Sequence, residues 1–145
     1  MALKKCLTRV YYVLLDEVSN MIEEEQSRKK RLLVRDWIGR RDSRGASTLL
    51  LKELAAEDVN EYKMCLRMTP EKFDTLLGSV AHKIERQNTQ MRDAISPRLI
   101  LEVTLHFMAT GNSYRTLQYF FRVSKSSVSN FIPEVCDVIY DSGNS

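Results

Sequence analysis

The fold of this chain is decided by one stretch, Ser113-Tyr-Arg-Thr-Leu-Gln-Tyr-Phe-Phe-Arg-Val-Ser-Lys-Ser-Ser-Val-Ser-Asn-Phe-Ile132. Its regularly placed apolar residues are Leu117, Phe121, Val123, Val128 and Phe131. Their spacing suits two short helices that cross around a turn of about three or four residues. Val123 would fill the turn, and the other four side chains would face inward. The stretch therefore predicts a helix-turn-helix over about residues 113–132.

The remaining residues of the second helix are short and polar. Those on its expected outward face are Lys125, Ser126, Ser129 and Asn130. Side chains of this kind can enter the major groove of DNA, where asparagine reads adenine and serine reads either base type. Three further residues flank the turn and are expected to contact phosphates, namely Arg115, Arg122 and Ser124. Ser124 is also expected to cap the second helix.

Two positions depart from the usual helix-turn-helix pattern. Gln118 stands where a small residue is often found, and Arg122 replaces the usual glycine of the turn. A plain helical corner is the alternative interpretation, because any helical hairpin buries residues at similar spacings. Residues 95–133 contain four basic residues against the single acid Glu102, and this balance favours the DNA-binding interpretation.

Upstream of this stretch, start signals for further helices recur. Asp58 begins a capping box, Thr69-Pro70 and Ser96-Pro97 each pair an N-cap with a first-turn proline, and residues 49–56 read as helical. Gly111 is expected to end the helix before the helix-turn-helix, and Pro133 to kink or restart the last one. With only 5 Gly and 3 Pro in 145 residues, the sequence predicts an all-α domain.

The first part of the chain has a different character. Apolar residues recur at helical spacing in residues 3–22, which predicts an amphipathic helix that docks on the domain, self-associates or binds a helical partner, or stays mobile. We therefore expect two segments, residues 1–45 and the helical domain 46–145. Residues 28–44 carry eight basic and two acidic residues, although the whole chain has a net charge of only +3.

That basic segment favours a polyanion, and the alternative is a solvated linker. Its expected contact residues are Arg28, Lys29, Lys30, Arg31, Arg40 and Arg41. Trp37, among these arginines, would either stack on a base or cap the core.

The remaining composition excludes several classes of function. The three cysteines, Cys6, Cys65 and Cys136, are far apart and form no CxxC pair, which is typical of reduced thiols in a nuclear or cytosolic protein and predicts no metal site. His82 and His106 have no second ligand at metal spacing. No stretch approaches the ~18 apolar residues of a membrane span, so we expect no membrane partner.

Four motifs resemble a known family. Residues 35–42, 66–74, 107–118 and 123–136 are similar, in order and spacing, to the N-terminal region of Harbinger-type (PIF/Harbinger) transposases and the nucleases derived from them. The resemblance implies a helical DNA-binding region that precedes a DDE-type nuclease core using divalent metal. The chain stops at Ser145, where such a core would begin, so we assign no catalytic residue and no cofactor to it.

Three functions follow from these observations. The first is a nuclear, or nuclear and cytoplasmic, module that binds double-stranded DNA through the helix-turn-helix. The second is the N-terminal part of a longer metal-dependent nuclease. The third is a helical interaction module that does not bind DNA.

Overall fold

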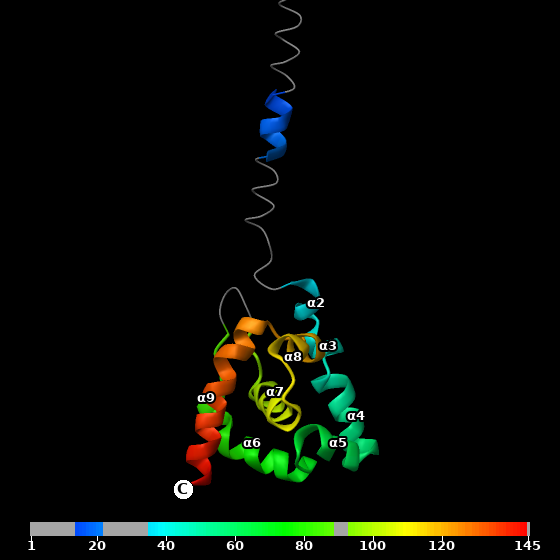
Figure 1. Ribbon diagram of the computed structural model, residues 1–145, viewed down its shortest axis with the longest axis vertical. Helices are drawn as coiled ribbons and strands as arrows, with labels where there is room; N and C mark the ends of the chain where they lie inside the picture. Colours follow the sequence, from blue (N-terminus) through cyan, green and yellow to red (C-terminus); the bar gives the residue numbers. More distant parts are fainter. Residues whose placement is uncertain (1–13, 22–34, 89–92, 145) are drawn as a thin grey trace, which may run out of the picture. The chain divides into compact units, whose positions relative to one another are not determined.

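The computed structural model describes residues 14–21, 35–88 and 93–144 (Figure 1). By its contacts the chain divides into two units, Met1–Leu33 and Val34–Ser145. In the first unit residues 14–21 are helical, as the sequence predicts, and the rest of the expected helix lies outside the described residues. In the described part of the chain no helix is long and apolar enough to cross a membrane.

The second unit consists of short helices in the order α2 Asp36–Gly39, α3 Arg41–Arg44, η1 Ser47–Leu51, α4 Lys52–Glu57, α5 Val59–Leu66, α6 Pro70–Ile84, α7 Pro97–Thr110, α8 Tyr114–Phe121 and α9 Lys125–Gly143. The segment η1 is a single π-helical turn that runs directly into α4. The described residues contain no strand, and the all-α prediction is confirmed.

Local sequence signals explain where the longer helices begin. Five N-cap side chains each accept a hydrogen bond from the backbone N–H three residues later, and they are Asp58, Thr69, Ser96, Ser113 and Ser124. Such caps satisfy backbone donors that the first turn of a helix leaves free. At the end of α7, Gly111 adopts the left-handed conformation with φ of 66°, which glycine tolerates without strain.

The core is organised around α7, which lies in the middle of the domain (Figure 1). Every residue from Leu99 to His106 is buried, and α7 packs against α5, α6, α8 and α9. A helix that is enclosed on all sides buries apolar surface around its whole circumference. The positions of α8 and α9 are thereby fixed against one central element.

The junction near residue 45 differs from the division that we expected there. Residues 36–45 form α2 and α3, and they contact the later helices. The backbone N–H of Ala46 donates to the carbonyl of Phe120 at 3.1 Å, and a Cβ added to Gly45 would lie 3.2 Å from the carbonyl oxygen of Phe121. These contacts join residues 36–45 to the helical domain.

The last helix also differs from expectation. It continues from Lys125 through Pro133 to Gly143 without a restart. Proline removes one backbone hydrogen bond, which Ser129 would otherwise accept. Both residues are exposed, so water can take the place of the missing donor.

Candidate nucleic-acid interface

The helix-turn-helix is formed by α8 and α9, and its inward residues are placed as the sequence predicts. Their exposed fractions are 0% for Leu117, 1% for Phe121, 1% for Val123, 0% for Val128 and 3% for Phe131. These five side chains are buried where α8, α9 and α7 pack against one another. Their burial fixes the rotation of α9 about its own axis. The direction of its polar face follows from that rotation.

The turn between α8 and α9 depends on Arg122. This residue adopts the left-handed conformation with φ of 56°, which costs a non-glycine residue roughly 1–2 kcal/mol. Its guanidinium donates from NH1 to the carbonyl of Trp37 at 2.9 Å and from Nε to the carbonyl of Arg44 at 3.1 Å. We predicted a phosphate contact here, and the structure shows two internal hydrogen bonds that hold α2 and α3 against the turn.

The exposed face of α9 contains the four predicted base-facing residues. Lys125, Ser126, Ser129 and Asn130 are all exposed, and they occupy the first two turns of the helix. The Ser129 hydroxyl donates to the carbonyl of Ser126 at 2.9 Å, which leaves its oxygen free to accept. Asn130 borders a hollow of 260 Å³ between α9 and the segment around Arg86.

The predicted phosphate contacts differ in their accessibility. Arg115 is exposed in the first turn of α8, and Ser124 is half-buried, accepting from the N–H of Ser127 at 3.3 Å. Arg40 is exposed, whereas the Arg41 side chain is only 11% exposed. Arg41 donates to the carbonyls of residues 93 and 94, at 3.0 and 3.3 Å. Arg28, Lys29, Lys30 and Arg31 lie outside the described residues.

Charge is distributed unevenly along α9. Lys125 is the only charged residue of its first two turns, and Arg115 is the only one in α8. Farther along α9 come the exposed acids Glu134, Asp137 and Asp141. Glu134 lies one helical turn beyond Asn130 and forms an ion pair with Arg86. The part of α9 that suits a phosphate-rich partner is therefore its N-terminal end.

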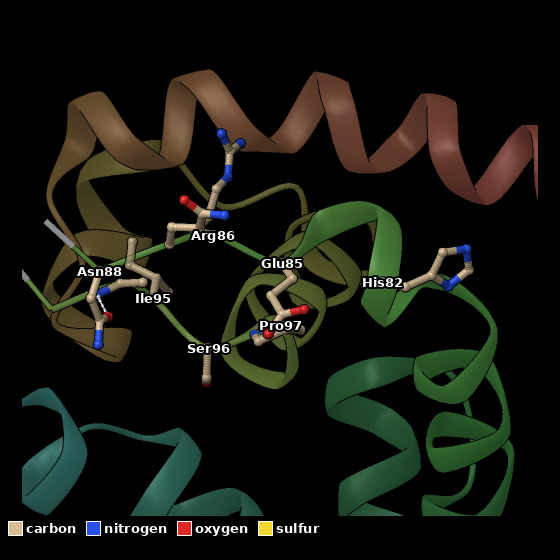
Figure 2. A pocket seen from close by; sticks show the side chains of 9 residues that line it. His82, Glu85, Arg86, Asn88, Ile95, Ser96 and Pro97 are labelled. Atoms are coloured by element: carbon tan, nitrogen blue, oxygen red, sulfur yellow. Dashed lines mark hydrogen bonds between the residues drawn. The ribbon is translucent and has the colours of Figure 1, made fainter.

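A second hollow, of 680 Å³, shares Arg86 with the first and is lined by His82 of α6, by residues that follow α6 and by the segment that leads into α7. Figure 2 shows that Arg86 points toward α9, whereas His82 points away from the other lining side chains. The titratable groups of this hollow do not converge on one point. Across the described residues, no group of three or more His, Cys, Asp or Glu side chains is placed to hold a metal ion.

His106 is part of the core. It is 7% exposed, and its Nδ1 donates to the carbonyl of Cys65 at 3.1 Å. Its ring stacks on Phe120 with 5.1 Å between centroids. Burial lowers the pKa of His106, and burial raises the pKa of the Cys65 and Cys136 thiols. These directions favour the uncharged form of each group, as expected of packing residues.

Glu102, to which the sequence pattern assigns no role, is buried on α7 with 2% of its surface exposed. Burial raises its pKa to about 7, against a hydrogen bond from Ser47 and the charges of Arg98 and Lys52. A glutamate with apolar neighbours on both sides, Leu101 and Val103, was the available signal. Its burial depends on α7 being enclosed on every side, which no local pattern reveals.

No protein-family model matches this chain, and no match was found among curated proteins or solved structures. The resemblance to Harbinger-type transposases stays a prediction from the four sequence motifs.

Proposed function

We propose that the helical domain binds double-stranded DNA by placing the first two turns of α9 in the major groove. The observation that carries this proposal is the burial of Val123 and Val128. With both valines inside the domain, Ser126, Ser129 and Asn130 of α9 face solvent. In the helix-turn-helix class, base contacts come from the N-terminal residues of this second helix.

The distribution of charge also favours the N-terminal end of α9 as the part that contacts DNA. The N-terminus of a helix carries a partial positive charge and free N–H groups, which favour phosphate. Lys125 and Arg115 add formal positive charge at this end, where α8 and α9 have no acid. Short side chains such as Ser126 and Asn130 let the helix approach the base edges closely. Within a nucleus, such a domain would direct a bound protein or a following nuclease core to a DNA site.

A protein-binding role is the second candidate, and one observation favours it for the first unit. The helix at residues 14–21 exposes four large apolar side chains, Leu14, Leu15, Val18 and Met21, whose exposed fractions run from 42% to 69%. Such a stripe suits a helical partner. This role concerns the first unit, and it is compatible with DNA binding by the second.

Fluorescence anisotropy with a panel of labelled duplexes at roughly 50 and 200 mM salt tests the DNA-binding proposal. We expect affinity to fall steeply with salt, because binding releases counterions from the phosphates. Asn130→Ala removes a proposed base contact, so the difference in binding free energy between preferred and other duplexes should shrink by about 1–3 kcal/mol. Asn60→Ala is the matched control, since Asn60 is an exposed asparagine on α5.

Two results would count against the proposal. One is an absence of salt-dependent binding to any duplex. The other is an equal effect of Asn130→Ala and Asn60→Ala on discrimination, which would show that α9 does not read the bases.

A further inference from the structure

The segment of residues 37–46 is fixed to the helix-turn-helix by two side chain-to-backbone hydrogen bonds and one backbone–backbone hydrogen bond. Arg122 in the turn donates to the carbonyls of Trp37 and Arg44, and the N–H of Ala46 donates to the carbonyl of Phe120 at the end of α8. These bonds satisfy groups that the turn and the C-terminus of α8 would otherwise leave free. They also bring α2 and α3 directly beside the turn.

Side-chain packing fixes the same segment. The rings of Trp37 and Tyr119 lie 5.8 Å apart between centroids, so α2 rests on α8. Gly45, which follows α3, lies so close to the end of α8 that an added Cβ would be 3.2 Å from the carbonyl oxygen of Phe121, besides being 2.5 Å from that of Arg41 in α3 itself. Backbone approach of this kind requires glycine. Consequently, α3 has a defined place beside α8.

The arginines of α3 and its N-cap residue Arg40 point in different directions. Arg41 turns inward and is held by the carbonyls of Asp93 and Ala94. Arg40 and Arg44 are exposed, and the N–H of Arg44 donates to the carbonyl of Arg40 at 2.8 Å. They are therefore one helical turn apart, and residues at this spacing share a face.

Three acids lie near this pair: Asp36 and Asp42 in the adjoining sequence, and exposed Asp93, whose backbone carbonyl accepts from Arg41 at 3.0 Å. Asp42 is two residues from both Arg40 and Arg44, a spacing that points it away from their face, and its carboxylate is 3.8 Å from Nε of Arg41. Asp36 opens α2, before the break at Gly39. The exposed face formed by α3 and its N-cap residue therefore carries two positive charges, those of Arg40 and Arg44.

We propose that Arg40 and Arg44 form a second phosphate-binding surface, which grips the backbone of the same duplex that α9 reads. The inference rests on the proposed DNA binding. In Figure 1, α2, α3 and the N-terminal end of α9 lie at the same end of the domain, so one duplex laid across that end meets both. Guanidinium groups match phosphate oxygens in geometry and stay charged at all relevant pH values. Arg122 is then a positioning residue, which holds α3 in place.

The test uses the whole chain and the same anisotropy assay across a range of salt concentrations. The double variant Arg40→Ala, Arg44→Ala should lower the salt slope by about two, roughly one for each lost phosphate contact. The double variant should weaken binding to all duplexes equally, so that the difference in affinity between one duplex and another stays unchanged. The control is Lys72→Ala, Lys83→Ala, which removes two exposed charges from α6 and should leave the slope near that of the unaltered chain.

Arg122→Ala separates positioning from direct contact. Added to the Arg40→Ala, Arg44→Ala variant, it should cause no further fall in the salt slope, because the residues that it positions are already absent. A further fall of about one would show that Arg122 itself binds phosphate, and would overturn the positioning role. Circular dichroism at each step identifies a variant that has lost its helices.

The outcomes distinguish the two proposals. Suppose that binding depends on Asn130 but that the salt slope of the Arg40→Ala, Arg44→Ala variant stays at its original value, or falls no further than that of the α6 control. The proposal of a second phosphate-binding surface is then wrong, and the proposed α9 interface stands. If the unaltered chain binds no duplex, both proposals are overturned.

Discussion

At the scale of single residues, Glu102 stands out because it places a carboxyl group inside the core. Its Oε1 lies 3.8 Å from NH1 of Arg98, and Ser47 donates a hydrogen bond to the carboxylate. Its Oε2 has no hydrogen-bond partner within the described part of the chain. An ionised carboxylate with an unsatisfied buried oxygen is costly, so the neutral form is favoured. Burial accordingly raises the pKa of Glu102 from 4.5 to about 7.

Stability should therefore depend on pH through Glu102. Because the pKa in the folded chain is above the unfolded value, the folded chain binds more protons between about pH 4.5 and 7. The free energy of unfolding should fall as pH rises through this window, by up to about 3 kcal/mol. Glu102→Gln removes this contribution, so the stability difference between variant and original should grow from pH 5 to pH 8 in urea denaturation.

His106 acts in the opposite direction, since burial lowers its pKa and charging it at low pH destabilises the fold. Its effect cancels in the difference between the Glu102→Gln variant and the original chain, because both contain His106. A stability difference that stays constant from pH 5 to pH 8 would mean that Glu102 does not titrate in this range.

At the scale of elements, the contact between α3 and α8 depends on Gly45. A Cβ at this position would meet backbone atoms of both elements, including the carbonyl oxygen of Phe121 at 3.2 Å. Backbone cannot move aside as a flexible side chain can, so Gly45→Ala should force α3 away from α8. We expect a loss of about 1–3 kcal/mol in the free energy of unfolding, as for other overpacked sites.

Gly78→Ala is the matched control for this prediction. Gly78 lies within α6 with nothing within 4 Å of an added Cβ, and alanine in a helix interior is favoured over glycine by roughly 0.5–1 kcal/mol. Urea denaturation should thus show opposite signs for the two glycines. Equal stabilisation by both substitutions would contradict the close approach at Gly45.

The starts of the helices and the rotation of α9 are the features of the elements that the sequence alone predicts. The starts of α6, α7, α8 and α9 were predictable, because each cap is a local event between a side chain and a backbone N–H three residues later. The inward rotation of α9 was predictable from the spacing of Val123 and Val128. Both signals involve residues close together in the chain.

Contacts between distant residues were not predictable in the same way. Arg122 suggested a phosphate contact, because its sequence context shows only an arginine beside a turn. Its partners, the carbonyls of Trp37 and Arg44, are 85 and 78 residues away in the chain. The short helices α2 and α3 are held by such contacts, and Gly39, where α2 ends, reads locally as a break in the helical pattern.

At the scale of the whole molecule, the helical domain has two dissimilar ends. One end carries α3, the turn of the helix-turn-helix and the N-terminal half of α9, and the other carries α5 and α6 (Figure 1). The net charge of +3 does not reveal this difference between the ends, because it sums the charges of the whole chain. Within α9, the first two turns contain no acid, and the exposed acids come later in the helix. We therefore predict that nucleic acid contacts the first end alone.

Amide chemical-shift mapping by NMR during titration with a duplex tests this claim most directly. We predict the largest changes at residues 113–116 and 124–130, with little change along α5 and α6. Changes concentrated on α5 and α6, or binding that leaves residues 124–130 unperturbed, would contradict the account.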